Sequence, residues 1–105
     1  MPTFILLTRL SPESVRNPEA YEELNTRIEA QIKAHAPEVR WIANYAILGP
    51  YDYLDVFEAP DERTAMKVST IVRSFGHATT ETWIAEPWSR FVELTREVAG
   101  AVARV

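Results

Sequence analysis

A turn, a strand and the start of a helix follow one another without a spacer in Leu48-Gly49-Pro50-Tyr51-Asp52-Tyr53-Leu54-Asp55-Val56-Phe57-Glu58-Ala59-Pro60-Asp61. The first part predicts a tight Gly-Pro-Tyr-Asp turn, because proline suits the second position of a turn. The aromatic and β-branched residues that follow predict a strand to about Glu58. Pro60 ends that strand, and Asp61 is a typical helix N-cap. The stretch therefore predicts a hairpin that leads directly into a helix.

The residues before this stretch predict a strand, a helix and a second strand. Residues 3–10 are apolar on both alternating faces, which is typical of a strand that is buried on both sides. A helix is expected to begin with Asn17 as N-cap and Pro18 as its first residue, and to end at Pro37. Its apolar stripe comprises Tyr21, Leu24, Ile28, Ile32 and His35. A strand over about residues 39–48 then completes an antiparallel hairpin.

The residues after Asp61 predict a helix, a strand and a last helix. The first of these helices has a buried face at Ala65, Val68, Val72 and Phe75, and Gly76 gives it a left-handed end. Residues 79–85 read as a fourth strand. Beyond Pro87 an amphipathic helix continues, with its apolar side at Trp88, Phe91, Val92, Thr95, Val98, Ala99 and Val102.

The predicted order is an α+β, ferredoxin-like βαββαβ domain with an additional C-terminal helix and an antiparallel four-stranded sheet, over residues 1–105. Two helices cover one face of the sheet. The other face is too apolar to remain in water, because the first strand is hydrophobic on both sides. The C-terminal helix or a second subunit must cover it, and we expect the second subunit.

Composition excludes several classes of function. The chain has 105 residues, no cysteine and a net charge of −4, so we expect no disulfide, no thiolate nucleophile, no nucleic-acid partner and no metal site. The apolar run that begins at Thr3 breaks at Arg9, which is too short for a signal sequence or a membrane span. We therefore expect no membrane partner and a cytoplasmic location.

The chain resembles the GYD family in Gly49, Tyr51 and Asp52, in the segment 58–61, and in Thr80-Glu81-Thr82. The resemblance covers nearly the full length. That family belongs to the dimeric α+β barrel superfamily, so the resemblance implies a homodimer or a higher homo-oligomer. It leaves the biochemical role open.

Three functional hypotheses follow. The superfamily includes ligand-sensing modules, and it also includes cofactor-free monooxygenases and haem-degrading proteins. The first hypothesis, which we prefer, is a protein that binds or senses a small organic molecule. The second is a cofactor-free or haem-dependent monooxygenase-like enzyme. The third is a structural or assembly protein whose apolar sheet face serves to oligomerise.

Pockets for small ligands are mostly apolar with a few well-placed polar groups. Alternation places Asp55 with Tyr53 and Phe57, on a face that we expect to be covered. Asp55 can serve as a general base or form an inter-subunit pair with Arg9 or Arg40. The full set of candidate ligand-binding residues is Asp55, Tyr45, Asn44, Tyr53, His77, Thr82 and Trp83.

Three further residues are assigned to structure. We expect Gly49 and Asp52 to fix the turn, and the ring of Tyr51 to pack against a neighbouring strand. No cofactor is predicted. Haem needs only one axial ligand, and His77, which follows a helix end, is the residue that can supply it.

Overall fold

The computed structural model describes residues 1–103 and has a ferredoxin-like α+β fold, as predicted. Its strands are β1 (Thr3–Leu10), β2 (Arg40–Ala46), β3 (Tyr53–Glu58) and β4 (Ala78–Ala85). Its helices are α1 (Pro12–Val15), the 3-10 helix η1 (Pro18–Ala20), α2 (Tyr21–His35), α3 (Glu62–Ser74) and α4 (Trp88–Ala103). The strands form one sheet in the order β2-β3-β1-β4, with every neighbouring pair antiparallel.

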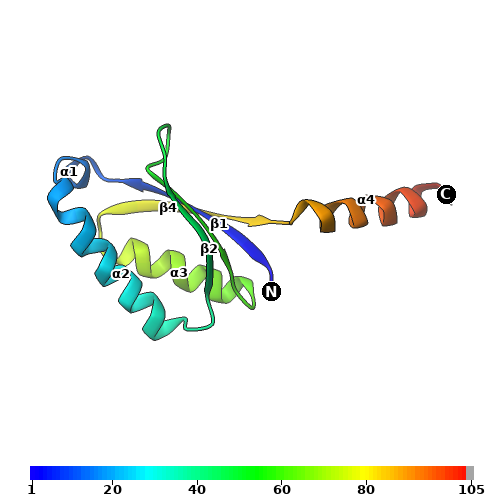
Figure 1. Cartoon of the computed structure of the whole chain (residues 1–105), viewed down its shortest axis with the longest axis horizontal. Helices are drawn as coiled ribbons and strands as arrows, with labels where there is room; N and C mark the ends of the chain where they lie inside the picture. Colours follow the sequence, from blue (N-terminus) through cyan, green and yellow to red (C-terminus); the bar gives the residue numbers. More distant parts are fainter. Residues whose placement is uncertain (104–105) are drawn as a thin grey trace.

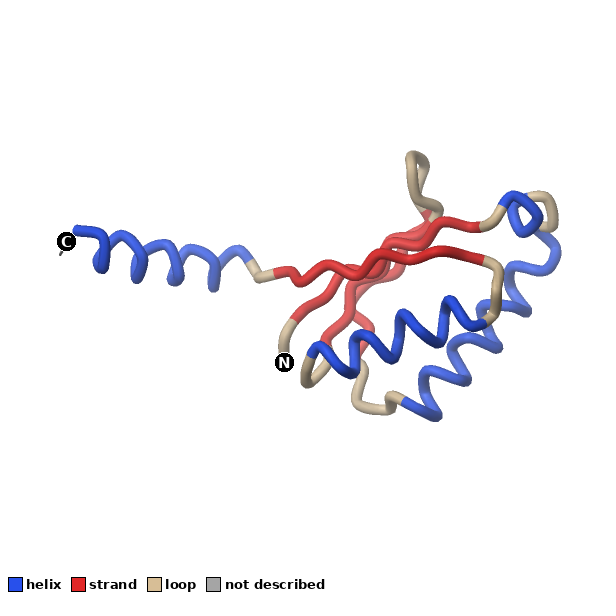
Figure 2. Tube along the Cα trace, turned by 180° about the vertical axis from the view of Figure 1, so that it is seen from behind, coloured by secondary structure: helices blue, strands red, loops and turns tan. Residues whose placement is uncertain are grey.

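Helices α2 and α3 lie on the same side of the sheet (Figures 1 and 2). We call the side that they cover the helix face and the opposite side the open face. Helix α4 extends away from the sheet and covers neither face in this chain. The molecule is consequently elongated, with extents of 59 × 30 × 18 Å. No helix within residues 1–103 is long and apolar enough to cross a membrane.

The hydrophobic core lies between the helix face and the helices α2 and α3. Phe4 and Phe57 stack at the centre of the sheet with their ring centroids 5.6 Å apart, and both are almost fully buried. Ile32 from α2 and Val68 from α3 belong to the same cluster. Each buried side chain of this size contributes roughly 1.5–3 kcal/mol, so this core fixes which face of the sheet the helices cover.

The register of the sheet aligns side chains in rows that cross all four strands. One row on the helix face contains Asn44, Asp55, Leu6 and Thr82 in strand order, and we call it the polar row. One row on the open face contains Ala43, Val56, Ile5 and Trp83, and the next contains Tyr45, Leu54, Leu7 and Glu81. The open face therefore has an apolar centre, as its sequence predicted.

The β2–β3 connection differs from the tight turn predicted at residues 49–52. Strand β2 ends at Ala46, and residues 47–52 form a longer loop that is closed by a 2.9 Å bond from Ile47 N to Asp52 O. Gly49 has a φ of +147°, a conformation that L side chains rarely adopt. The loop is longer than expected because Asp52 also bonds to β1, which holds the end of the hairpin over the sheet.

The start of the first long helix also differs from the prediction. Residues 12–15 form α1, whose N-terminus is capped by the Ser11 side chain, and η1 separates it from α2. Asn17 precedes η1 but makes no capping bond through its side chain. The predicted stripe ends differently as well, because His35 is exposed and Ala36 is buried in its place.

Helix α3 follows the prediction at both ends. The Asp61 carboxylate accepts a 2.7 Å bond from the Thr64 hydroxyl and a 2.8 Å bond from Thr64 N, and both bonds lower the pKa of Asp61. Gly76 follows the helix with a φ of +74°, as expected for a left-handed end. The loop after α3 is therefore short, and residue 77 lies directly before the start of β4.

Candidate functional site

A cavity of about 150 Å³ lies between the helix face of the sheet and α2. We call it the sheet–α2 cavity. Its apolar wall is formed by Leu6, Leu10, Leu24, Ile28, Ile32, Trp41 and Val72. Its polar lining is Thr8, Ser14, Tyr21, Asn25, Glu29, Asn44, Tyr53, Asp55 and His77. A largely apolar space with converging polar groups is the usual form of a small-ligand site.

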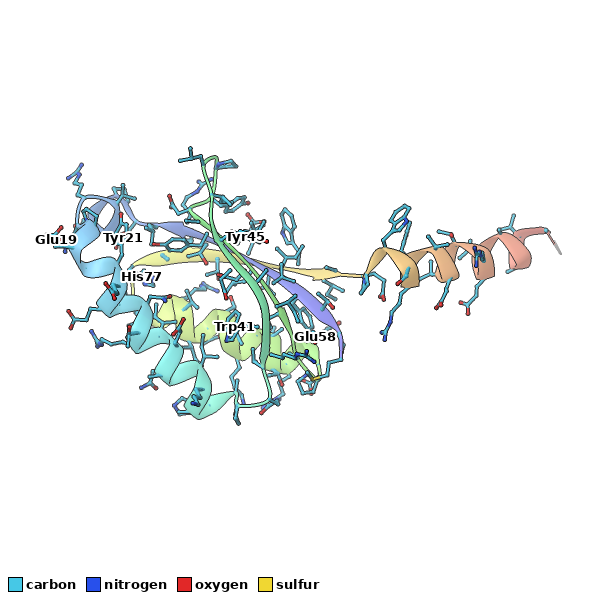
Figure 3. All side chains as sticks on the ribbon, in the orientation of Figure 1. Glu19, Tyr21, Trp41, Tyr45, Glu58 and His77 are labelled. Carbon is cyan, nitrogen blue, oxygen red and sulfur yellow. The ribbon has the colours of Figure 1, made fainter. Side chains whose placement is uncertain are left out.

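Four of the seven predicted ligand-binding residues line this cavity, namely Asn44, Tyr53, Asp55 and His77. Figure 3 shows Tyr21, Trp41 and His77 on the side of the sheet where α2 and α3 lie. Thr82 belongs to the polar row but borders a separate, more open groove beside α3.

The remaining two predicted residues lie on the other side of the sheet. Tyr45 and Trp83 project from the open face, where they are 60% and 49% exposed. The sequence does not predict which face of the sheet these two aromatic residues occupy. The central strand β1 is apolar on both of its faces, so its pattern does not show which face the helices cover. Tyr45 and Trp83 therefore cannot contribute to the sheet–α2 cavity of their own chain.

Asp55 is partly buried in the polar row. Its Oδ1 atom accepts a 2.7 Å hydrogen bond from the Asn44 amide on the neighbouring strand. Burial raises the pKa of the Asp55 carboxyl, the Asn44 bond opposes this rise, and the negative charge of Glu29 adds to it. Neither arginine predicted to pair with Asp55 faces it in this chain, because Arg9 and Arg40 lie on the open face.

His77 is only 9% exposed and lies at the cavity end of β4. Its Nδ1 atom is buried and has no hydrogen-bond partner within residues 1–103. Burial lowers the pKa of the imidazole below its ordinary value of 6.5. The ring therefore favours the neutral form and retains unused hydrogen-bonding capacity.

Sequence reasoning missed the polar side chains that α2 contributes to the cavity. Asn25 and Glu29 line it between the predicted apolar positions, and Asn25 donates a 3.2 Å bond to Glu29 Oε1. Residues four apart lie on the same side of a helix. The signal was therefore present, since Asn25 and Glu29 continue the face that begins at Tyr21.

The Gly-Pro-Tyr-Asp loop connects the hairpin to the rest of the sheet. Asp52 N donates to Thr8 O, and Leu10 N donates a 2.8 Å bond to Asp52 Oδ2. These bonds continue the pairing of β1 beyond the last ladder pair, Thr8 with Tyr53. Asp52 therefore holds the end of β1, which lines the cavity through Thr8 and Leu10.

Tyr51 lies over the open face rather than in the cavity. Its hydroxyl donates to the Glu81 carboxylate of β4, and the Arg9 guanidinium lies 5.5 Å from the centre of its ring. Arg9 also donates a 2.7 Å bond to Pro50 O. The Glu81 bond is the main cause of a raised pKa for Tyr51 and a lowered pKa for Glu81. Tyr51 thus attaches the loop to β1 and β4.

The cavity does not fit a haem. A space of about 150 Å³ accommodates a molecule close to one benzene ring in size, far smaller than a porphyrin. The carboxylates of Asp55 and Glu29 would also repel the negatively charged propionates of haem. No cluster of three or more metal-ligating side chains is present within residues 1–103.

The fold and the sheet–α2 cavity together define the chain as a ferredoxin-like α+β protein with a small cavity beneath α2, lined by both polar and apolar side chains. The GYD domain matches residues 4–95, so the chain belongs to the GYD family.

One relative is 38% identical to the chain over 91 residues, which cover 83% of this chain and 90% of the relative. It is the glutamine synthetase and cystathionine beta-lyase binding protein of Thermus thermophilus. Two solved structures share the fold. FFRP-DM1 has a TM-score of 0.55 and 22% identity over 82% of this chain and 100% of its own. TTHA0845, also from Thermus thermophilus, has a TM-score of 0.51 and 24% identity over 83% and 95%.

Proposed function

We propose that this protein binds a small organic molecule in the sheet–α2 cavity. The observation that carries the proposal is a single cavity whose apolar wall is combined with the polar side chains of Asn44, Asp55 and His77. Asp55 is held by β3 and oriented by the Asn44 amide of β2, and His77 lies directly before β4. Rigid strands that orient a few polar groups are what selective binding of a small ligand requires.

The size of the cavity limits the ligand. A volume of about 150 Å³ suits a molecule of roughly one aromatic ring with a short polar substituent. A ligand of this size has few atoms, so we expect affinities from micromolar to millimolar.

The test is protein-observed NMR with isoleucine methyl labelling. Ile28 and Ile32 line the cavity, whereas Ile5 and Ile84 do not, so the protein carries its own control positions. A panel of single-ring compounds should give intermolecular NOEs to the first pair and not to the second. Compounds that contact only Ile5 or Ile84, or that contact no isoleucine, would contradict the proposal. Conversion of a bound compound into a product would instead favour the enzymatic hypothesis, which uses the same cavity.

Binding to an enzyme is the second candidate function. Two observations favour it. The relative from Thermus thermophilus is named as a binding protein for two enzymes, and the described apolar residues of α4 are largely exposed in this chain. Trp88, Phe91 and Val98 are 74%, 42% and 53% exposed, although they share the apolar side of the helix. Such a side requires a protein partner to cover it.

Immobilised glutamine synthetase tests this second candidate. The chain should bind in biolayer interferometry, and Phe91→Glu should weaken binding at least tenfold because it places a charge on the apolar side of α4. Arg96→Glu, on the same helix but outside the apolar side, is the matched control and should bind like the wild type. Equal loss in both variants, or no binding by the wild type, would argue against this function.

We further propose that the protein acts as a homodimer in which two open faces pack together. The support is the apolar centre of that face, which is flanked by charges of both signs. Arg40 and Glu58 lie 3.9 Å apart on one side, and Arg9 and Glu81 lie near Tyr51 on the other. A two-fold axis brings such a surface against itself with opposite charges available for pairing.

A further inference from the structure

We propose that the sheet–α2 cavity selects a small organic cation, a protonated amine on a single ring or short apolar chain, whose ammonium group is bound by Asp55 and Glu29. This inference rests on the proposed function and goes beyond it, because it names the chemical class of the ligand. It follows from the charges, the hydrogen bonds and the aromatic residues that line the cavity.

The charged lining of the cavity is negative. Asp55 and Glu29 both line it, and no lysine or arginine does. Arg27 of α2 places its guanidinium 5.4 Å from the centre of the ring of Phe75, which is not part of the lining. An anionic ligand would therefore meet repulsion, while a cation would supply the missing opposite charge.

Each of the two carboxylates is oriented by an amide and keeps one oxygen free. Asn44 donates to Asp55 Oδ1, and Asn25 donates to Glu29 Oε1. No side chain within residues 1–103 donates to Asp55 Oδ2 or Glu29 Oε2. An ammonium group carries up to three N–H donors and no acceptor, so it matches two free carboxylate oxygens better than a neutral group does.

Aromatic rings complete the lining in a way that also suits a cation. Tyr21 enters from the start of α2, Trp41 from β2 and Tyr53 from β3. The face of an aromatic ring attracts a positive charge, and several rings around one space are a recurrent means of binding organic ammonium groups. The apolar wall of Leu24 and Ile28 then accommodates the uncharged part of the ligand.

His77 is an independent sign that a ligand completes this cavity. Its side chain is more than nine-tenths buried, it lines the cavity, and its Nδ1 atom has no partner within the described chain. A buried polar side chain without a hydrogen bond destabilises the free protein and calls for an explanation. Because the buried ring favours the neutral form, it adds no positive charge to the cavity that would repel the amine.

Three probes of nearly equal size test the inference by NMR titration. Benzylamine is cationic, benzyl alcohol is neutral, and benzoate is anionic. Benzylamine should bind in the cavity at least about tenfold more tightly than benzyl alcohol, as expected for a charge-assisted hydrogen bond, and benzoate should not bind there. Asp55→Asn should weaken benzylamine binding several-fold, toward the affinity for benzyl alcohol, and leave the alcohol unaffected.

Two further variants control for folding and for general charge. Glu29 is exposed at the cavity, so Glu29→Gln removes a cavity charge without risk to the core and should weaken benzylamine binding several-fold. Glu23→Gln removes the same charge from α2 outside the cavity and should have no effect.

The outcomes separate this inference from the proposed function. If benzyl alcohol or benzoate binds in the cavity as tightly as benzylamine, the ligand is not a cation and the inference fails, while the proposed function stands. If Glu23→Gln weakens benzylamine binding as much as Glu29→Gln does, the effect is one of net charge and the inference also fails. If none of the three probes contacts Ile28 or Ile32, the inference fails, and the proposed function fails with it when the wider panel of single-ring compounds contacts neither residue.

Discussion

The carboxylate of Asp52 connects the Gly-Pro-Tyr-Asp loop to the stability of the whole sheet. It accepts the hydrogen bond of Leu10 N, at the end of β1, from a position 42 residues further along the chain. Asp52→Ala leaves that partly buried N–H without a partner and should lower the free energy of unfolding by about 1–3 kcal/mol. Asp52→Asn keeps an acceptor at the same place and should lose less. Urea unfolding followed by circular dichroism measures both values, and an alanine variant within about 0.5 kcal/mol of the wild type would refute this role.

The buried imidazole of His77 should make stability depend on pH. Its folded pKa lies below the unfolded value of 6.5, so between these two values the unfolded chain binds more protons than the folded chain. The stability contributed by the neutral ring is complete above pH 6.5 and is lost as the pH falls below it. His77→Gln removes this dependence.

Unfolding measured at pH 7.5 and pH 5.5 tests that sign. Asp55, Glu29, Tyr21 and Tyr53 line the same cavity and are unchanged in the variant, so the difference between wild type and variant isolates the histidine. The wild type should lose more stability on acidification than His77→Gln. An equal loss in the two proteins would show that His77 is not responsible.

At the scale of secondary structure, Gly76 ends α3 in a conformation that other residues adopt at a cost. Its φ is +74°, and a Cβ atom added there would meet nothing within 4 Å, so only backbone strain opposes a side chain. Gly76→Ala should therefore destabilise the fold by about 1–2 kcal/mol. Gly100→Ala is the matched control, since Gly100 also has open space but lies within α4 without a positive φ. Its stability should stay equal or rise slightly, and similar losses in the two variants would contradict the argument.

The order of the elements was predictable because each carries its own local signal. Asp61 and Gly76 mark the two ends of α3, and both act as their residue types predict. The β2–β3 loop was not predictable, because its shape depends on the contact of Asp52 with Leu10, which are distant in sequence. The short helix α1 was missed although Ser11 caps it, and the helix predicted from Pro18 begins there as the 3-10 turn η1 and becomes α2 at Tyr21.

The location of the candidate site was only partly predictable for a physical reason at the same scale. Alternation placed Asp55 with Phe57, but β1 is apolar on both sides, so the strands alone do not decide which face the helices cover. The packing of Phe4 and Phe57 against α2 and α3 decides it, and this puts Asp55 in a cavity within one chain. Because the helices pack on the face that carries Phe4 and Phe57, Tyr45 and Trp83 lie on the open face.

The shape of the whole molecule supports the proposed homodimer. The body buries one face of its sheet, while the open face and α4 keep large apolar side chains in solvent, among them Trp83, Trp88 and Phe91. Large apolar side chains that gather on one surface of a protein mark an interaction site. A second copy placed open face to open face would cover the central rows, and its two α4 helices would then have a protein surface within reach.

A charge placed at the centre of the open face tests this arrangement. Val56 lies in the row with Ile5 and Trp83 and packs outside the hydrophobic core, so Val56→Lys should leave the monomer folded and prevent a sheet-to-sheet dimer. Thr79→Lys adds the same charge to the same face at a position near its edge, and it should remain dimeric. Sedimentation equilibrium should give twice 12.0 kDa for the wild type and Thr79→Lys, and 12.0 kDa for Val56→Lys. A monomeric wild type would mean that the open face is reserved for another protein, whereas a dimeric Val56→Lys would mean that the dimer forms through α4 instead.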